Sequence, residues 1–208
     1  MAKTEAIQVD RRGRRREAKQ AKILAEAWDL AHRDGLAAIS LRDLADRVDL
    51  RQPSLYAYFD SKLGLFDLMF ADGNLQLLEL MTSLPISNDP REALVEFVQA
   101  LVQFSTEDVV RHQLLFQRTI PGFEPSPASY AFAVEFYEIA RRYLAAAGVS
   151  DARDVDVFSA LVNGLAHQQV ANDPGGDRWV RLSEQAVDMF LADVNRRRQS
   201  SFQKGARL

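Results

Sequence analysis

Two short helices joined by a tight turn are predicted for residues 40–62, SLRDLADRVDLRQPSLYAYFDSK, and no other stretch restricts the fold as strongly. Ala45 falls in the middle of the first short helix, where a larger side chain would block the close crossing of the second. Asp49 follows four residues later, at a turn position that needs a left-handed backbone; Gly adopts it best, and Asp tolerates it. The spacing of these two residues predicts a helix-turn-helix.

The other residues of this segment separate into an inner apolar set and an outer polar set. The contacts that lock the two helices together are expected from Leu44, Leu50, Leu55 and Phe59. The outward-facing side chains are expected to be Arg42, Gln52, Ser54, Tyr56 and Tyr58. A polar, aromatic-studded second helix suits the major groove of DNA. The alternative is an ordinary small helical hairpin, which also has a turn and a few leucines.

Charge is distributed unevenly along the chain. The formal net charge of the 208 residues is −3, but residues 1–62 carry 13 Lys and Arg against 10 Asp and Glu, a net of +3. Within residues 1–22 the count is 8 against 3, mostly from the run RRGRRR. A basic N-terminal end on an acidic body is typical of a protein that touches phosphate with one end only. The arginine run could enter a neighbouring minor groove, raise non-specific affinity, or be a solvated tail.

Helical periodicity recurs over the whole length, and no strand-like alternation is present, so we predict an all-α fold of about nine helices. Caps and breakers place a helix at residues 17–34 and two short helices within 40–62, capped by Ser40 and Arg51. The others are placed at residues 61–81, 90–104, 108–119, 126–147, 150–171 and 178–194. Residues 1–16 lack apolar periodicity and are expected to be a mobile basic arm. The basic residues 197–208 are expected to be a frayed tail.

Chemistry other than binding has little support in the sequence. There is no cysteine, no Gly-rich phosphate loop and no GxSxG elbow, and His32, His112 and His167 lack metal-ligand spacing. We therefore expect no enzyme activity, no catalytic residue, no metal and no cofactor. No apolar run reaches the roughly 20 residues of a membrane span or resembles a signal peptide. We expect a cytoplasmic protein with no membrane partner.

The last two predicted helices are too apolar for the surface of a monomer. The final helix has two apolar faces, and the preceding one carries Gly164 in its middle. We expect them to pack against their mates as a four-helix bundle in a two-fold homodimer. The expected interface residues are Phe158, Leu161, Gly164, Leu165, Trp179, Leu182, Ala186, Met189 and Phe190. The alternative is an ordinary core helix with a glycine defect.

Residues 17–66 resemble the tetracycline-repressor (TetR) family of bacterial regulators, in a helix ended by Gly35, then SLRDLADR, then LRQPSLYAYFDSK. The resemblance implies that Gln52, Pro53 and Ser54 face base edges and that Arg42 reaches an adjacent base. It implies phosphate contacts from Tyr56, Tyr58 and Lys62, with Ser40 joining them. Asp49 and Arg51 depart from the usual glycine and capping Ser or Thr, and Arg51 could add a phosphate contact. The predicted DNA-binding residues are thus Ser40, Arg42, Arg51, Gln52, Pro53, Ser54, Tyr56, Tyr58 and Lys62.

The resemblance also implies that the C-terminal part holds a pocket for a small, mostly apolar effector. The candidate lining residues are Phe97, Gln103, Phe104, His112, Phe116, Gln117, Phe136, Asn163 and His167, although aromatic stripes are also typical of a plain core. The predicted domains are the arm 1–16, a three-helix DNA-binding head 17–62, a helical ligand-binding and dimerisation domain 63–196, and the tail 197–208.

The sequence thus predicts a homodimeric regulator, expected to be a repressor. It would bind a pseudo-palindromic double-stranded DNA operator and leave it when the effector binds. The alternative is a DNA-binding dimer whose C-terminal domain contacts another protein instead of a small ligand.

Overall fold

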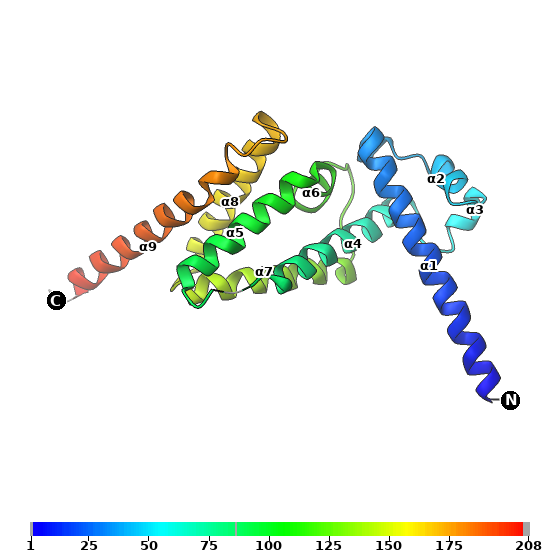
Figure 1. Ribbon diagram of the computed structural model, residues 1–208, viewed down its shortest axis with the longest axis horizontal. Helices are drawn as coiled ribbons and strands as arrows, with labels where there is room; N and C mark the ends of the chain where they lie inside the picture. The colour runs from blue at the N-terminus through cyan, green and yellow to red at the C-terminus, as the bar shows by residue number, and fades with distance from the viewer. Residues whose placement is uncertain (1, 86, 206–208) are drawn as a thin grey trace. The chain divides into compact units, whose positions relative to one another are not determined.

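The computed structural model describes the backbone of residues 2–205 except residue 86, and the side chains of residues 13–200 with the same exception. The described part is all-α, as predicted, with nine α-helices, two short 3-10 helices and no strand (Figure 1). The helices are α1 (Ala2–Asp34), η1 (Leu36–Ala38), α2 (Leu41–Arg47), α3 (Gln52–Leu55), α4 (Lys62–Ser83), α5 (Pro90–Glu107), α6 (Val109–Phe116), α7 (Pro127–Ala146), α8 (Ala152–Asn172), η2 (Val180–Leu182) and α9 (Ser183–Gly205). No helix in this part is long and apolar enough to cross a membrane.

The chain forms two compact units that do not divide at the predicted boundary after residue 62. The first unit runs through Gly73 and also takes in Gln113–Tyr130. The second comprises Asn74–His112 and the chain from Ala131 onward. The segment predicted to be the head therefore shares one unit with the first half of α4 and with the segment that joins α6 to α7.

The first unit is organised around the apolar stripe of α1. Ile23, Ala27 and Ala31 are 0% exposed, and α1 packs against α2 (Figure 1). Trp28 donates its indole N–H to Asp72 of α4 at 2.8 Å, which gives this large buried side chain a polar partner. Gly35, with φ of 85°, then stops α1 in the left-handed conformation that glycine adopts without strain.

Helix α1 begins at Ala2, so the prediction that the helix starts near Glu17 was wrong. The segment before Glu17 is rich in Arg and also contains Ala, Glu, Lys and Gln, which have high helix propensity, and Gly13 is its weakest helix former. A helix that continues past the core needs no apolar stripe, and the absence of periodicity was therefore misleading. The mobility predicted for residues 1–16 stays a prediction.

The second unit is built on α5, which packs against both α8 and α9 (Figure 1). Asp89 caps α5 by accepting hydrogen bonds from the backbone N–H groups of Arg91 and Glu92, as the Asn-Asp-Pro sequence suggests. Inside the unit, Phe97 stacks on Tyr143 of α7 with ring centroids 4.7 Å apart. Asp151, one residue after the predicted Ser150, caps α8.

The C-terminal helices differ from the prediction at their ends. Helix α6 ends at Phe116 instead of residue 119, and α9 begins at Ser183 instead of Arg178. The later start of α9 has a tertiary cause: buried Gln169 accepts hydrogen bonds from the backbone N–H of Trp179 at 2.8 Å and of Val180 at 3.4 Å. The predicted frayed tail is also partly wrong, because α9 continues to Gly205. Its Arg197 forms an ion pair with buried Asp154 of α8 at 2.7 Å.

A carboxylate of α4 holds the start of α7 within the first unit. Asp67 accepts hydrogen bonds from the backbone N–H of Ser126 at 2.7 Å and from the hydroxyls of Ser126 and Ser129, both at 2.8 Å. Ser126 also accepts from the backbone N–H of Ser129 at 3.2 Å, as an N-cap does. The negative charge of Asp67 therefore lies at the positive end of α7, where it is favourable.

Removal of this carboxylate should destabilise the fold. We expect Asp67→Ala to lower the free energy of unfolding by about 2–3 kcal/mol, because three donors lose a charged acceptor. Ser129→Ala, which removes only one of the three bonds, should cost about 1 kcal/mol. Chemical denaturation of both variants measures the difference; equal effects would contradict the central role of Asp67.

Candidate nucleic-acid interface and adjoining pocket

The helix-turn-helix has the geometry that its spacing predicts. Ala45 is 1% exposed at the crossing of α2 and α3, and Asp49 has φ of 54°, the left-handed value that the turn requires. Ser40 caps α2 by accepting a hydrogen bond from the backbone N–H of Asp43 at 3.3 Å. Leu50 donates its backbone N–H to the carbonyl of Ala45 at 2.9 Å, which closes the turn.

Four of the five side chains expected to face outward are exposed, and Tyr58 is the exception. Helix α3 has only four residues, and it buries Leu55 while the chain beyond it turns and buries Phe59. The side chains left exposed are Arg42, Arg51, Gln52, Pro53, Ser54 and Tyr56. Pro53 lies in the first turn of α3, where its missing N–H leaves no hydrogen bond unmade. The base and phosphate contacts of these residues stay predictions.

Three of the residues predicted to contact phosphate are half-buried: Ser40, Tyr58 and Lys62. Lys62 donates to the carbonyl of Ala37 at 2.8 Å and lies 5.8 Å from the ring centroid of Phe66. An ammonium group has three donors, so Lys62 can keep this internal bond and still present N–H groups to a phosphate.

A basic groove between α1 and the turn after α3 was missed by the sequence reasoning. Arg15, Arg16 and Lys19 line a hollow of about 460 Å³ together with Ala57 and Tyr58. Arg16 donates to the carbonyl of Ala57 at 3.1 Å, and Lys19 donates to the carbonyl of Val48 at 2.8 Å. We name these five residues the α1 groove. The signal that could have revealed it is the helical spacing of Arg15, Arg16 and Lys19, which is recognisable only if the helix is known to start before Glu17.

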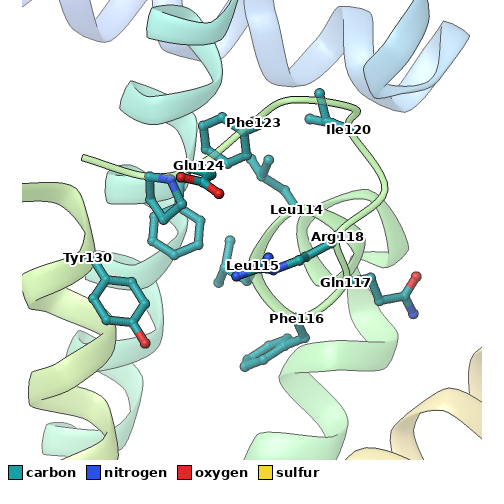
Figure 2. A pocket seen from close by; sticks show the side chains of 11 residues that line it. Leu114, Leu115, Phe116, Gln117, Arg118, Ile120, Phe123, Glu124 and Tyr130 are labelled. Atoms are coloured by element: carbon teal, nitrogen blue, oxygen red, sulfur yellow. The ribbon is translucent and has the colours of Figure 1, made fainter. Parts of the chain in front are cut away.

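A second hollow, of about 460 Å³, lies between α4 and the segment that joins α6 to α7, wholly within the first unit. Its lining is shown in Figure 2 and consists of Phe70, Leu114, Leu115, Phe116, Gln117, Arg118, Ile120, Phe123, Glu124, Pro125 and Tyr130. We name it the loop pocket. Phe123 packs edge-on against Phe66 and Phe70 of α4, with ring centroids 6.1 and 6.2 Å apart.

The structure divides the predicted effector residues into several environments. Phe116 and Gln117 line the loop pocket, and their contact with a ligand stays a prediction. Phe97 and Phe104 are buried in the second unit, where Phe97 stacks on Phe136 and Phe104 lies 3.6 Å under the guanidinium of Arg111. They are core residues there.

The prediction that the polar candidates look inward was wrong for three of them. These residues, all solvent-exposed, are Gln103, Asn163 and His167. Gln103 instead donates to Glu107, one turn along its own helix, at 2.8 Å. His112 is the exception, because it is only 2% exposed. Burial lowers the pKa of His112, and the nearby charge of His167 lowers it further.

The residues proposed for the dimer interface also fall into two groups. Those buried within the second unit's own core are Phe158, Leu165, Ala186 and Phe190; the rings of Phe158 and Phe190 are 5.0 Å apart. The assignment of these four to an interface was wrong, since their own protomer covers them. Leu161 and Trp179 are half-buried, while Gly164, Leu182 and Met189 are exposed.

Comparisons with known proteins agree with this description of the head. Residues 23–69 match the sequence profile of the family described as bacterial regulatory proteins, tetR family. No curated protein sequence is significantly similar to the chain. Among solved structures, a TetR-family transcriptional regulator from Streptomyces coelicolor is similar with a TM-score of 0.67 at 19% identity, over 86% of this chain and 82% of that one.

Two further solved structures have the same fold. The TetR family transcriptional regulator PfmR from Thermus thermophilus matches with a TM-score of 0.56 at 24% identity, covering 82% of this chain and 97% of that one. A variant of TetR from Acinetobacter baumannii, in complex with minocycline, matches with a TM-score of 0.59 at 25% identity, covering 86% and 97%.

The head is a helix-turn-helix with an exposed polar surface, the arrangement of a DNA-binding head. The profile match over residues 23–69 makes this head similar to that of the TetR family, and the chain shares its fold with solved TetR-family regulators.

The buried histidine should make stability depend on pH. In the unfolded chain His112 binds a proton with a pKa near 6.5, whereas in the folded chain burial lowers this pKa. The free energy of unfolding should therefore fall as the pH drops below about 6.5, by at most about 1.4 kcal/mol per pH unit from this group. Denaturation between pH 5 and 8 measures this slope. His112→Leu should flatten it, and an unchanged slope would contradict the assignment.

Proposed function

We propose that the protein is a homodimeric repressor that binds a pseudo-palindromic operator in the cytoplasm and is released by a small effector. The observation that carries this proposal is the exposed polar surface of α2 and α3 beside the basic α1 groove. That surface is what a recognition helix needs, since bases are read by exposed polar side chains while cationic groups hold the flanking phosphates.

The residue types fit operator recognition. Gln52 can pair with the N6 and N7 atoms of adenine, Arg42 with the O6 and N7 atoms of guanine, and Pro53 offers apolar contact to a thymine methyl. Tyr56, Tyr58 and Lys62 carry hydroxyl and ammonium donors suited to phosphate oxygens. The α1 groove adds cations on the flank of the same surface.

An exposed apolar strip on α8 and α9 supports the homodimer. Val157 is 52% exposed and Met189 is 66% exposed, and Leu182 and Gly164 are exposed with them. A Cβ placed on Gly164 would meet no atom within 4 Å in the single chain, so the protomer itself gives no reason for glycine there. Two heads in a two-fold dimer would read half-sites about 34–36 Å apart, or a multiple of that spacing.

The loop pocket supports effector binding. Its volume lies in the range of small-molecule sites, roughly 300–1,000 Å³, and its lining combines apolar walls with a few polar groups. The solved TetR variant from Acinetobacter baumannii was obtained in complex with minocycline, a small molecule. For release, the effector must bind the DNA-free conformation more tightly than the DNA-bound one.

Replacement of the recognition glutamine tests the operator-reading role. We expect Gln52→Ala to weaken binding to the operator by about 1–3 kcal/mol while leaving binding to random DNA unchanged, because only the base contact is lost. Fluorescence anisotropy on both DNAs measures the two affinities. The matched control is Gln99→Ala, an exposed glutamine of α5. Equal losses on both DNAs would remove the base-reading role of Gln52.

The α1 groove should contribute through phosphate alone. We expect Arg15→Gln to weaken binding to operator and random DNA alike and to reduce the slope of log K against log salt by about 0.9, the value for one lost phosphate contact. Arg141→Gln, which removes the same charge from an exposed site in the second unit, is the control. A slope that matches the control would show that the groove does not contact DNA.

A charge on the α8–α9 strip should separate the protomers. We expect Met189→Arg to shift the protein to a monomer in sedimentation velocity at micromolar concentration, since an unpaired charge would be buried at the interface. Val134→Arg, at an exposed apolar site of α7, should leave the assembly unchanged. A wild-type monomer under the same conditions would refute the dimer.

A further inference from the structure

The loop pocket carries two opposite charges on its lining. Arg118 and Glu124 both contribute to its wall, and both are solvent-exposed. Among the residues that the structure describes, neither side chain makes an ion pair. Figure 2 shows the side chain of Arg118 extending toward Leu115 and the carboxylate of Glu124 beside Phe123. An unpaired cation and an unpaired anion thus face the same aromatic-walled space.

This pair of charges restricts the ligand that the pocket can prefer. A ligand with only a negative charge would meet Arg118 favourably and Glu124 unfavourably, and a cationic ligand would have the opposite problem. A fully apolar ligand would leave both charged groups without compensation as it displaced their water. Only a ligand that carries both a negative and a positive charge gains from both side chains.

The remaining lining describes the body of the ligand. Phe70 and Leu114 are buried and form the floor, and Phe116, Phe123 and Tyr130 add aromatic surface. Aromatic and aliphatic walls of this kind favour a flat or branched apolar body.

We propose that the loop pocket binds a small zwitterion: a compound with an aromatic or branched apolar body whose anionic group pairs with Arg118 and whose cationic group pairs with Glu124. Free aromatic and branched-chain amino acids have this chemistry. The inference names the chemical class of the effector, and in that respect it rests on the proposed function.

The position of the pocket explains how such a ligand could act on DNA binding. Its wall residue Phe123 packs on Phe66 and Phe70 of α4, and the segment ends at Ser126, which Asp67 of α4 holds at 2.7 Å. Helix α4 begins at Lys62, directly after the recognition segment. A further hollow of about 360 Å³, next to the loop pocket, shares Arg118 and Glu124 with it and reaches Leu63 in the first turn of α4. A ligand held by both charges therefore acts on the contact between this segment and the helix that follows the reading surface.

The test is calorimetric titration of the full-length protein with L-tryptophan, L-phenylalanine and L-leucine, and with N-acetyl-L-tryptophan and L-tryptophan methyl ester. We expect at least one free amino acid to bind, and removal of either ligand charge to weaken binding about tenfold or more, equivalent to about 1.4 kcal/mol. Arg118→Gln should abolish the preference for acid over ester. Glu124→Gln should abolish the preference for free over acetylated amine. Arg141→Gln should change neither preference.

The outcomes are distinct. Charge preferences that disappear in the matching variants support the proposal. It is overturned if no free amino acid of the set binds at millimolar concentration, if the blocked derivatives bind as tightly as L-tryptophan, or if the variants keep the wild-type preferences. Operator binding is measured separately on the same wild-type protein. Zwitterion binding without operator binding would refute the proposed function and leave the ligand inference standing; operator binding without zwitterion binding would do the reverse.

Discussion

The close crossing of α2 and α3 is the constraint on which the exposed polar surface of these two helices depends. Ala45 allows the two helices to approach, and the left-handed backbone at Asp49 reverses the chain between them. Lys22 of α1 pairs with the Asp49 carboxylate at 3.2 Å, and Lys19 donates to the carbonyl of Val48, so the long first helix supports the turn from outside. Exposure of Gln52 and Arg42 follows from this arrangement, because a wider crossing would turn α3 and its polar side away.

The same unit also contains the loop pocket, which no division of the chain at residue 62 would suggest. Residues 113–130 are compact with the head, and Asp67 and Phe123 attach them to α4. The helix-turn-helix and the loop pocket thus lie in one folded unit. An effector there needs no long path of communication to reach the helix that follows the reading surface.

Local signals predicted the head well, and tertiary effects limited the rest. The roles of Ser40, Ala45 and Asp49 depend on caps and sterics within a few residues, which a sequence displays directly. The start of α9 depends on Gln169, which is distant in the chain, and no local signal marks it. Aromatic periodicity could not separate Phe97, a core residue, from Phe116, a pocket residue, since both recur at helical spacing. The loop pocket's charged residues Arg118 and Glu124 lie outside any helix and left no periodic signal.

Gly164 has a consequence that reaches beyond assembly. In the single chain this residue has open space beside it, so alanine would fit and would favour the helix by about 1 kcal/mol. In the proposed dimer, however, a methyl group at this position would hold apart the two helices that pack there. The stability of the protomer therefore favours alanine at position 164, whereas close packing of the two helices in the proposed dimer favours glycine. In the proposed dimer, selection for thermal stability alone would therefore replace this glycine. Variants selected in that way would lose dimerisation while each protomer kept its fold.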